Sequence, residues 1–283
     1  MSAIRHHSVH VEDLDVFVRE AGDSTRPTLV CLPGYPSSTR AYVRLIDRLA
    51  TDWHVVAIDY PGFGWSQPLP GTPTFDRLAA VTGATIDALG IEDYALYMFD
   101  FGAPVGFRIA LRHDRRVRAI VTQNANAYTD GLGPGVAPLA AWWADEHAGR
   151  AAIDEFLSLA GTQAQWRAGA RDVEHVDPDH ALADQRVLDL PARAEYMRAL
   201  LWDYQSNPPL YPDWQTWLRT RRPHLLAIWG GNDPFFVPAG ALAYQRDVPA
   251  AEVVLLDTGH FALEEEADEI AARVGALLAA TFA

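Results

Sequence analysis

The stretch LYMFDFGAPVG, residues 96–106, decides the fold of this chain. Its apolar run ends at Asp100, and Gly102 follows two residues later, where a helical pattern begins. A residue in such a turn between a buried strand and a helix lies at the carboxyl edge of the sheet. The backbone N–H groups at the start of the helix hold negative charge there. Asp100 therefore has two interpretations, a helix cap or a carboxylate that reacts.

On both sides of this stretch, short apolar runs rich in β-branched residues alternate with helical patterns. That alternation predicts an α/β fold with a mostly parallel, eight-stranded sheet flanked by helices. The expected strands are residues 7–11, 14–20, 28–33, 54–60, 94–100, 117–124, 224–230 and 251–258. The expected helices are residues 38–50, 74–89, 102–113, 238–247 and 261–280. The first two strands are expected to form an antiparallel hairpin.

The alternation stops after the sixth expected strand. Residues 127–213 are helical in pattern and rich in tryptophan. A helical block between the sixth and seventh strands indicates an inserted cap, or lid, whose aromatic side chains cover a pocket. The predicted organisation is therefore a core of residues 1–126 and 214–283, with a helical cap of residues 127–213.

Two further segments support the catalytic interpretation of Asp100. Asp233 follows the next-to-last expected strand, in IWGGNDPFFVP, and His260 follows the last one, in LLDTGHFALEEE. The carboxyl ends of parallel strands meet at one edge of a sheet, so the three side chains are expected to converge there. Their order along the chain is nucleophile, acid and base.

These features resemble the α/β-hydrolase superfamily, and within it the branch with an aspartate nucleophile. That branch contains epoxide hydrolases, haloalkane dehalogenases and haloacetate dehalogenases. LPGYPSSTRAYVRLIDRLA (32–50) resembles the family's oxyanion segment, with Pro33 where histidine is usual, and VVAIDYPGFGWS (55–66) resembles the next strand and loop. The resemblance implies an oxyanion hole formed by the backbone N–H groups of Tyr35 and Phe101.

The resemblance also implies a chemistry. A carboxylate is suited to displacement at an sp3 carbon, which gives an alkyl ester, and is poorly suited to attack on amides or esters. His260, oriented by Asp233, then deprotonates the water that hydrolyses this ester. Peptidase, lipase and thioesterase activities are therefore disfavoured.

The group that leaves separates the branches of the family. An epoxide oxygen needs a proton donor, usually a lid tyrosine, whereas a halide needs N–H donors, usually tryptophan indoles. Tyr204 lies where epoxide hydrolases have their second lid tyrosine, and Trp142 and Trp143 occupy the region of the first. These three residues are the expected leaving-group site, and a cluster of this kind suits either an epoxide oxygen or a halide.

Two residues favour an epoxide. Phe101 follows the nucleophile, where haloalkane dehalogenases have tryptophan and haloacetate dehalogenases have arginine, and Tyr35 is aromatic, as in epoxide hydrolases. Arg108, further along, is expected to face solvent or an ion pair. The predicted function is hydrolysis of an uncharged, fairly apolar or aromatic epoxide to a vicinal diol. The alternatives are a hydrolytic dehalogenase and a recruited non-hydrolytic enzyme or small-molecule binding module.

Composition limits the partners. A formal charge of −14 argues against nucleic acid and anionic membranes, and the absence of lysine excludes Schiff-base chemistry. A small-molecule substrate and water are expected, with no cofactor or metal, in a cytoplasmic monomer or homodimer. Asn124, Asn126 and Phe261 are further possible pocket residues.

Overall fold

A computed structural model describes residues 3–283 and contains one eight-stranded sheet. The strand order is β1-β2-β4-β3-β5-β6-β7-β8, in which β1 and β2 form an antiparallel hairpin, β2 pairs antiparallel with β4, and the later pairings are parallel. The strands are β1 (Arg5–Val11), β2 (Leu14–Ala21), β3 (Thr28–Leu32), β4 (His54–Ile58), β5 (Tyr94–Phe99), β6 (Val117–Gln123), β7 (His224–Gly230) and β8 (Glu252–Leu256). The predicted fold class is confirmed.

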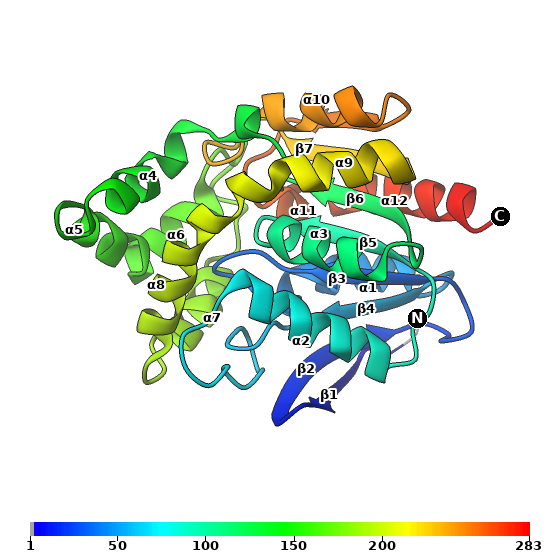
Figure 1. Ribbon diagram of the computed structural model, residues 1–283, viewed down its shortest axis with the longest axis horizontal. Helices are drawn as coiled ribbons and strands as arrows, with labels where there is room; N and C mark the ends of the chain where they lie inside the picture. Colours follow the sequence, from blue (N-terminus) through cyan, green and yellow to red (C-terminus); the bar gives the residue numbers. More distant parts are fainter. Residues whose placement is uncertain (1–2) are drawn as a thin grey trace.

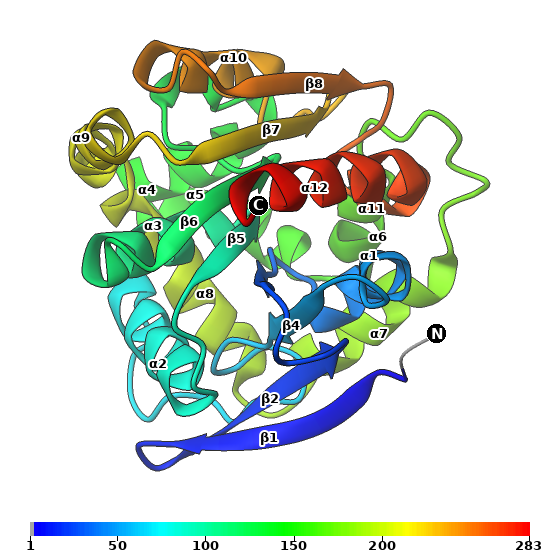
Figure 2. The same cartoon turned by 90° about the vertical axis from the view of Figure 1, so that its right-hand side faces the viewer.

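Helices cover both faces of this sheet (Figures 1 and 2). One face carries α2 (Phe75–Ala88), α3 (Gly102–His113), α9 (Tyr211–Arg221) and α10 (Pro238–Asp247), and the other carries α1 (Val43–Leu49) and α12 (Ala267–Thr281). Side chains of β5 alternate between the two layers: Leu96 and Met98 join the first core, and Tyr97 and Phe99 join the second. Strands buried on both sides explain why the predicted runs are continuously apolar.

Two predicted helices are divided in the structure. Residues 38–50 form a short 3-10 turn, η1 (Thr39–Tyr42), followed by α1. Residues 261–280 form α11 (Ala262–Glu265) and then α12, because the chain at Glu266 leaves helical geometry. The remaining three predicted helices agree with α2, α3 and α10 to within a residue.

A block of helices between β6 and β7 gathers at one end of the sheet (Figure 1). These inserted helices are α4 (Ala137–Ala144), α5 (Glu146–Phe156), α6 (Leu159–Arg167), α7 (Pro178–Leu188) and α8 (Arg193–Asp203), with 3-10 turns η2 (Thr129–Gly131), η3 (Pro134–Val136), η4 (Tyr204–Ser206) and η5 (Pro208–Leu210). The boundary expected at residue 213 falls inside α9. That helix packs on the core through Trp214, which stacks on Phe107 of α3 at 5.1 Å between ring centroids.

The end of the inserted block is tied to the core beneath it. The Tyr196 hydroxyl in α8 donates to the Pro61 carbonyl at 2.8 Å, and the backbone N–H of Phe75 donates to the Asp203 carboxylate at 2.7 Å.

No helix within residues 3–283 combines the length and apolar character needed to cross a bilayer.

Candidate active site

Asp100 occupies a strained turn directly after β5. Its φ is +51°, in the left-handed region that costs free energy for any residue other than glycine. The residue immediately before α3, its N-cap, is Phe101, whose side chain makes no capping hydrogen bond. The Asp100 carboxylate therefore does not act as the cap of α3. It turns instead toward the loop after β3.

Close packing explains the glycines of this turn. A Cβ on Gly102 would lie 2.6 Å from the carbonyl oxygen of Leu32, and a Cβ on Gly106 would lie 2.3 Å from Sδ of Met98. Gly106 thus leaves the space that the bulky Met98 occupies below the turn. The large side chain two residues before Asp100 is accommodated by this glycine on the facing helix.

Two backbone N–H groups hold the Asp100 carboxylate. The N–H of Tyr35 donates to Oδ1 at 2.6 Å, and the adjacent N–H of Phe101 also favours the ionised carboxylate by lowering its pKa. These are the two N–H groups expected to form an oxyanion hole. With Pro33 in place of the usual histidine, the Tyr35 N–H still points at Asp100. Donors in this position stabilise negative charge on Oδ1 when a tetrahedral centre forms at the carboxyl carbon.

His260 lies on the other side of Asp100. Its Nδ1 is 2.7 Å from Oδ2 of Asp233, and its Nε2 is 4.0 Å from Oδ2 of Asp100. The long second distance leaves Nε2 free of a direct hydrogen bond to Asp100 and able to take a proton from a water. The structure therefore brings Asp100, Asp233 and His260 together at the carboxyl edge of the sheet, as the sequence predicts.

Burial controls the protonation of the two groups that face each other. Burial raises the pKa of Asp100 to about 6, although His260 and the N–H groups of Tyr35 and Phe101 oppose the shift. Burial also lowers the pKa of His260, but attraction to the Asp233 carboxylate and their hydrogen bond outweigh it, so that pKa is raised overall.

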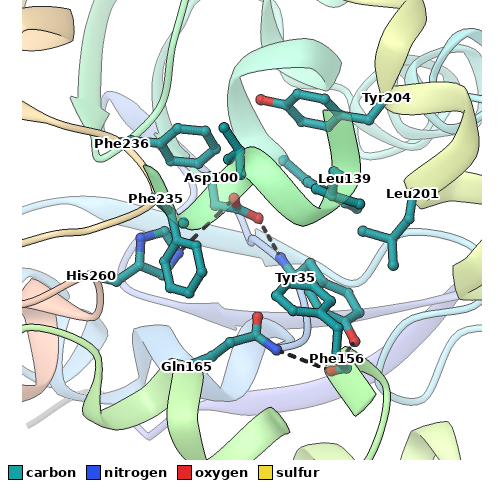
Figure 3. A pocket seen from close by; sticks show the side chains of 13 residues that line it. Tyr35, Asp100, Leu139, Phe156, Gln165, Leu201, Tyr204, Phe235, Phe236 and His260 are labelled. Atoms are coloured by element: carbon teal, nitrogen blue, oxygen red, sulfur yellow. Dashed lines mark hydrogen bonds and ion pairs between the residues drawn. The ribbon is translucent and has the colours of Figure 1, made fainter. Parts of the chain in front are cut away.

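A small cavity of about 30 Å³ opens beside Asp100 (Figure 3). Its lining is largely aromatic and aliphatic, and it combines side chains from the strand ends with side chains from the inserted helices. The lining residues are Tyr35, Asp100, Phe101, Gly135, Val136, Leu139, Phe156, Gln165, Leu201, Tyr204, Phe235, Phe236 and His260. A space of this size has room for about two water molecules.

Of the expected leaving-group residues, Tyr204 reaches the cavity. Burial, together with the neighbouring Tyr211 hydroxyl and the Asp100 carboxylate, keeps the pKa of Tyr204 well above its ordinary value. The hydroxyl is therefore protonated at neutral pH. Arg108 holds the turn that follows Tyr204 by donating to the Asn207 side chain at 2.7 Å.

Trp142 and Trp143, the other two expected leaving-group residues, lie outside the cavity lining. Trp143 donates its indole N–H to the Leu201 carbonyl at 3.0 Å, and Trp142 packs edge-on against Trp202 at 4.8 Å between centroids. Their indoles serve the packing of α4 against α8.

The further pocket residues lie elsewhere too. Asn124 sits behind the site, where its Nδ2 donates to Oδ2 of Asp233 at 2.7 Å. Asn126 is buried close to Gly131 and outside the lining. Phe261 stacks on Trp166 with 3.7 Å between centroids.

Arg108 takes up the second of its two expected environments, an ion pair. It is buried and pairs with Asp76, Nε to Oδ1, at 2.5 Å. The ion pair is therefore confirmed and the solvent exposure is not.

Sequence reasoning missed several lining residues. Phe235 and Phe236 follow Asp233 after the intervening Pro234, and this closeness in sequence to the acid was the available signal. Leu139, Phe156 and Gln165 come from three different inserted helices. Their convergence depends on helix packing that no local pattern encodes.

Known proteins share this architecture. The family model described as alpha/beta hydrolase fold matches residues 27–267. A protein of Saccharomyces cerevisiae described as an uncharacterized hydrolase is 38% identical over 282 residues, which cover 97% of each chain. Haloalkane dehalogenase 2 of Mycobacterium tuberculosis is 32% identical over 103 residues, 36% of each chain.

A solved structure shows the same fold over nearly the full length. The 2-hydroxy-6-oxo-6-phenylhexa-2,4-dienoate hydrolase of a Rhodococcus species superposes with a TM-score of 0.80 at 18% identity, covering 98% of this chain and 99% of that one. At that identity the likeness concerns the fold alone. Together with the family match over residues 27–267, it places the chain by its architecture and sequence: the protein belongs to the α/β-hydrolase fold family, and it is a hydrolase.

Proposed function

We propose that this hydrolase opens small epoxides to vicinal diols through a covalent ester on Asp100. Oδ2 of Asp100 attacks an epoxide carbon, the C–O bond breaks, and the ring oxygen takes the proton of the Tyr204 hydroxyl. Water, deprotonated by Nε2 of His260, then attacks the carboxyl carbon of the ester. The diol leaves, Tyr204 regains its proton, and Asp100 returns as a carboxylate.

The two oxygens of Asp100 suit these two tasks. Oδ1 accepts the Tyr35 N–H at 2.6 Å, so it is held as the oxygen that carries charge in the tetrahedral intermediate. Oδ2 faces His260 and is the oxygen left to form the bond to carbon. The 2.7 Å contact to Asp233 orients the imidazole for the hydrolytic step.

The observation that supports the epoxide assignment is the Tyr204 hydroxyl in an otherwise largely apolar cavity lining. Tyr204 supplies a protonated hydroxyl there, and none of the cavity-lining residues within 3–283 is a tryptophan. The Trp143 ring stacks on Tyr204 at 6.1 Å between centroids, but its indole N–H is already bound to the Leu201 carbonyl. The lining therefore offers an alkoxide its proton donor and lacks the indole pair typical of halide binding.

Hydrolytic dehalogenation is the second candidate. The partial likeness to haloalkane dehalogenase 2 favours it. The same ester would form with loss of halide instead of ring opening, and the second half of the reaction would be unchanged. The small size of the cavity suits a short organohalide equally well.

A His260→Gln variant tests both candidates, because it should form the ester and fail to hydrolyse it. The variant is incubated with short epoxides and short organohalides, and the intact protein mass is measured. A gain equal to the whole epoxide, absent in Asp100→Asn, supports the proposal. A gain equal to the organohalide less HX favours dehalogenation. If neither gain occurs and the wild type is also inactive, the ester mechanism is wrong for these classes.

A further inference from the structure

Gln165 brings a carboxamide into the cavity, and the ester mechanism gives it no task. The residue lies in α6, is 4% exposed and belongs to the cavity lining. A buried amide needs hydrogen-bond partners, because burial without them costs free energy. An atom of the Gln165 amide that finds no partner in the protein therefore indicates which kind of group a bound molecule would offer it.

The orientation of this amide is fixed by its neighbours. Nε2 points at two backbone carbonyl oxygens, those of Phe156 and Gly161, each at 3.4 Å. The reverse orientation would set the amide oxygen against both carbonyl oxygens, which is repulsive. Oε1 is consequently the atom that faces the cavity.

Oε1 has no donor within residues 3–283. The nearby Tyr35 hydroxyl donates to the Phe156 carbonyl at 3.4 Å, and it also interacts with the Gln165 side chain, an interaction that opposes the rise in the pKa of Tyr35 caused by burial, as expected for donation from Nε2. Figure 3 shows the Gln165 nitrogen directed to Phe156 and its oxygen directed into the space beside His260 and Asp100. The cavity thus contains an amide oxygen that accepts no hydrogen bond within these residues.

Gln165 and Tyr204 enter the cavity on opposite sides of Asp100 (Figure 3). Tyr204 is the donor for the oxygen that is released, so Gln165 lies on the side of the substrate away from it. Building on the proposed function, we infer that the substrate carries its own hydrogen-bond donor, an alcohol O–H, and that Oε1 of Gln165 accepts it. The substrate class is a short hydroxyalkyl epoxide, with hydroxyalkyl halides as the counterpart if a halide leaves.

Matched substrates isolate this contact. Glycidol and 1,2-epoxybutane differ by an O–H in place of a methyl group, and 3-chloropropan-1-ol and 1-chlorobutane form the corresponding chloride pair. The ratio of kcat/KM within each pair is measured for the wild type and for Gln165→Met. The wild type is expected to prefer the alcohol, and Gln165→Met to lose about tenfold in that ratio.

Gln185→Met is the control. Gln185 is also buried in the inserted helices and donates to the Asp189 side chain at 2.8 Å, but it does not line the cavity. Its replacement should leave the ratio unchanged. An equal ratio in the wild type and Gln165→Met overturns the inference. A parallel fall for both members of a pair, with ester accumulating, also overturns it, because Gln165 would then act on water.

Binding separates this inference from the proposed function. Glycerol and butane-1,2-diol are titrated into each protein and followed by NMR. Tighter binding of glycerol by the wild type, lost in Gln165→Met, supports the role of Gln165 even if no substrate is turned over. Turnover of epoxides without any such preference supports the proposed function and overturns the assignment of Gln165.

Discussion

Asn124 donates from Nδ2 to Oδ2 of Asp233 at 2.7 Å. The same carboxylate oxygen is 2.7 Å from Nδ1 of His260, and the other oxygen accepts the Phe235 N–H at 2.7 Å. Asn124 itself is held in a left-handed conformation, with φ of +45°, and accepts the Gly230 N–H at 2.9 Å. The acid is thus fixed from behind by a residue on the neighbouring strand end.

Asn124→Ala is therefore expected to lower kcat about 10- to 100-fold, because a hydrogen bond to a buried carboxylate is lost. Loss of that bond also makes Asp233 a stronger partner for the imidazolium, so the pKa of His260 should rise. Ester hydrolysis needs neutral His260, so the pH at which kcat rises should move upward. A pH profile of kcat measures this shift. Asn126→Ala, a nearby buried amide outside the site, should leave the profile in place.

The pKa of Asp100, about 6, sets the pH dependence of the first step. The nucleophile reacts as a carboxylate, so kcat/KM for an epoxide should fall about tenfold per pH unit below that pKa and level off above it. Steady-state rates on one substrate across this range provide the measurement. If kcat/KM instead begins to fall only near the ordinary pKa of an aspartate, the proposed desolvation of Asp100 is contradicted.

Asp100 also links stability to pH. Its pKa is higher in the folded chain than in the unfolded chain, so the folded state binds the proton more tightly. Stability is therefore lost as the pH rises from about 4 through about 6, by about 3 kcal/mol in all. Asp100→Asn should be more stable than the wild type near neutral pH, with a margin that shrinks toward pH 4. Denaturant unfolding at both ends of this range checks the sign.

Substitutions at Tyr204 and Trp143 should distinguish an epoxide oxygen from a halide as the leaving group. Tyr204→Phe removes the donor to the alkoxide and should slow epoxide opening about 100-fold or more, while ester hydrolysis in an already alkylated enzyme continues. Trp143→Phe should change turnover only a few-fold, because that indole N–H is bound to Leu201. A large effect of Trp143→Phe on halide release, with little effect of Tyr204→Phe, would favour the dehalogenase.

Local pattern predicts the sheet and the three charged residues well. Each of Asp100, Asp233 and His260 lies in the turn after a strand with an apolar run; β5 and β7 are almost fully buried, and the edge strand β8 is partly exposed. Parallel strands then oblige their ends to meet, whatever the details of packing. The position of Asn124, one residue beyond β6, follows from the same rule, but its partner is Asp233 and not the cavity.

The cavity wall is a different problem. Trp142 and Trp143 lie in α4, a helix with apolar side chains on every side, so its sequence does not indicate which face turns inward. Leu201 and Gln165 come from other helices of the same block. Contacts among these helices decide which side chains reach Asp100, and such non-local packing leaves no periodic trace in the chain.

The lining of the cavity has two origins. Asp100 and His260 are supplied by strand ends, whereas Leu139, Gln165 and Tyr204 are supplied by the segment inserted between β6 and β7. The groups proposed to react and the groups proposed to select the substrate are therefore carried by separate stretches of the chain. Replacement of residues in the insertion is expected to change which molecule is accepted, while Asp100, Asp233 and His260 keep their places at the strand ends.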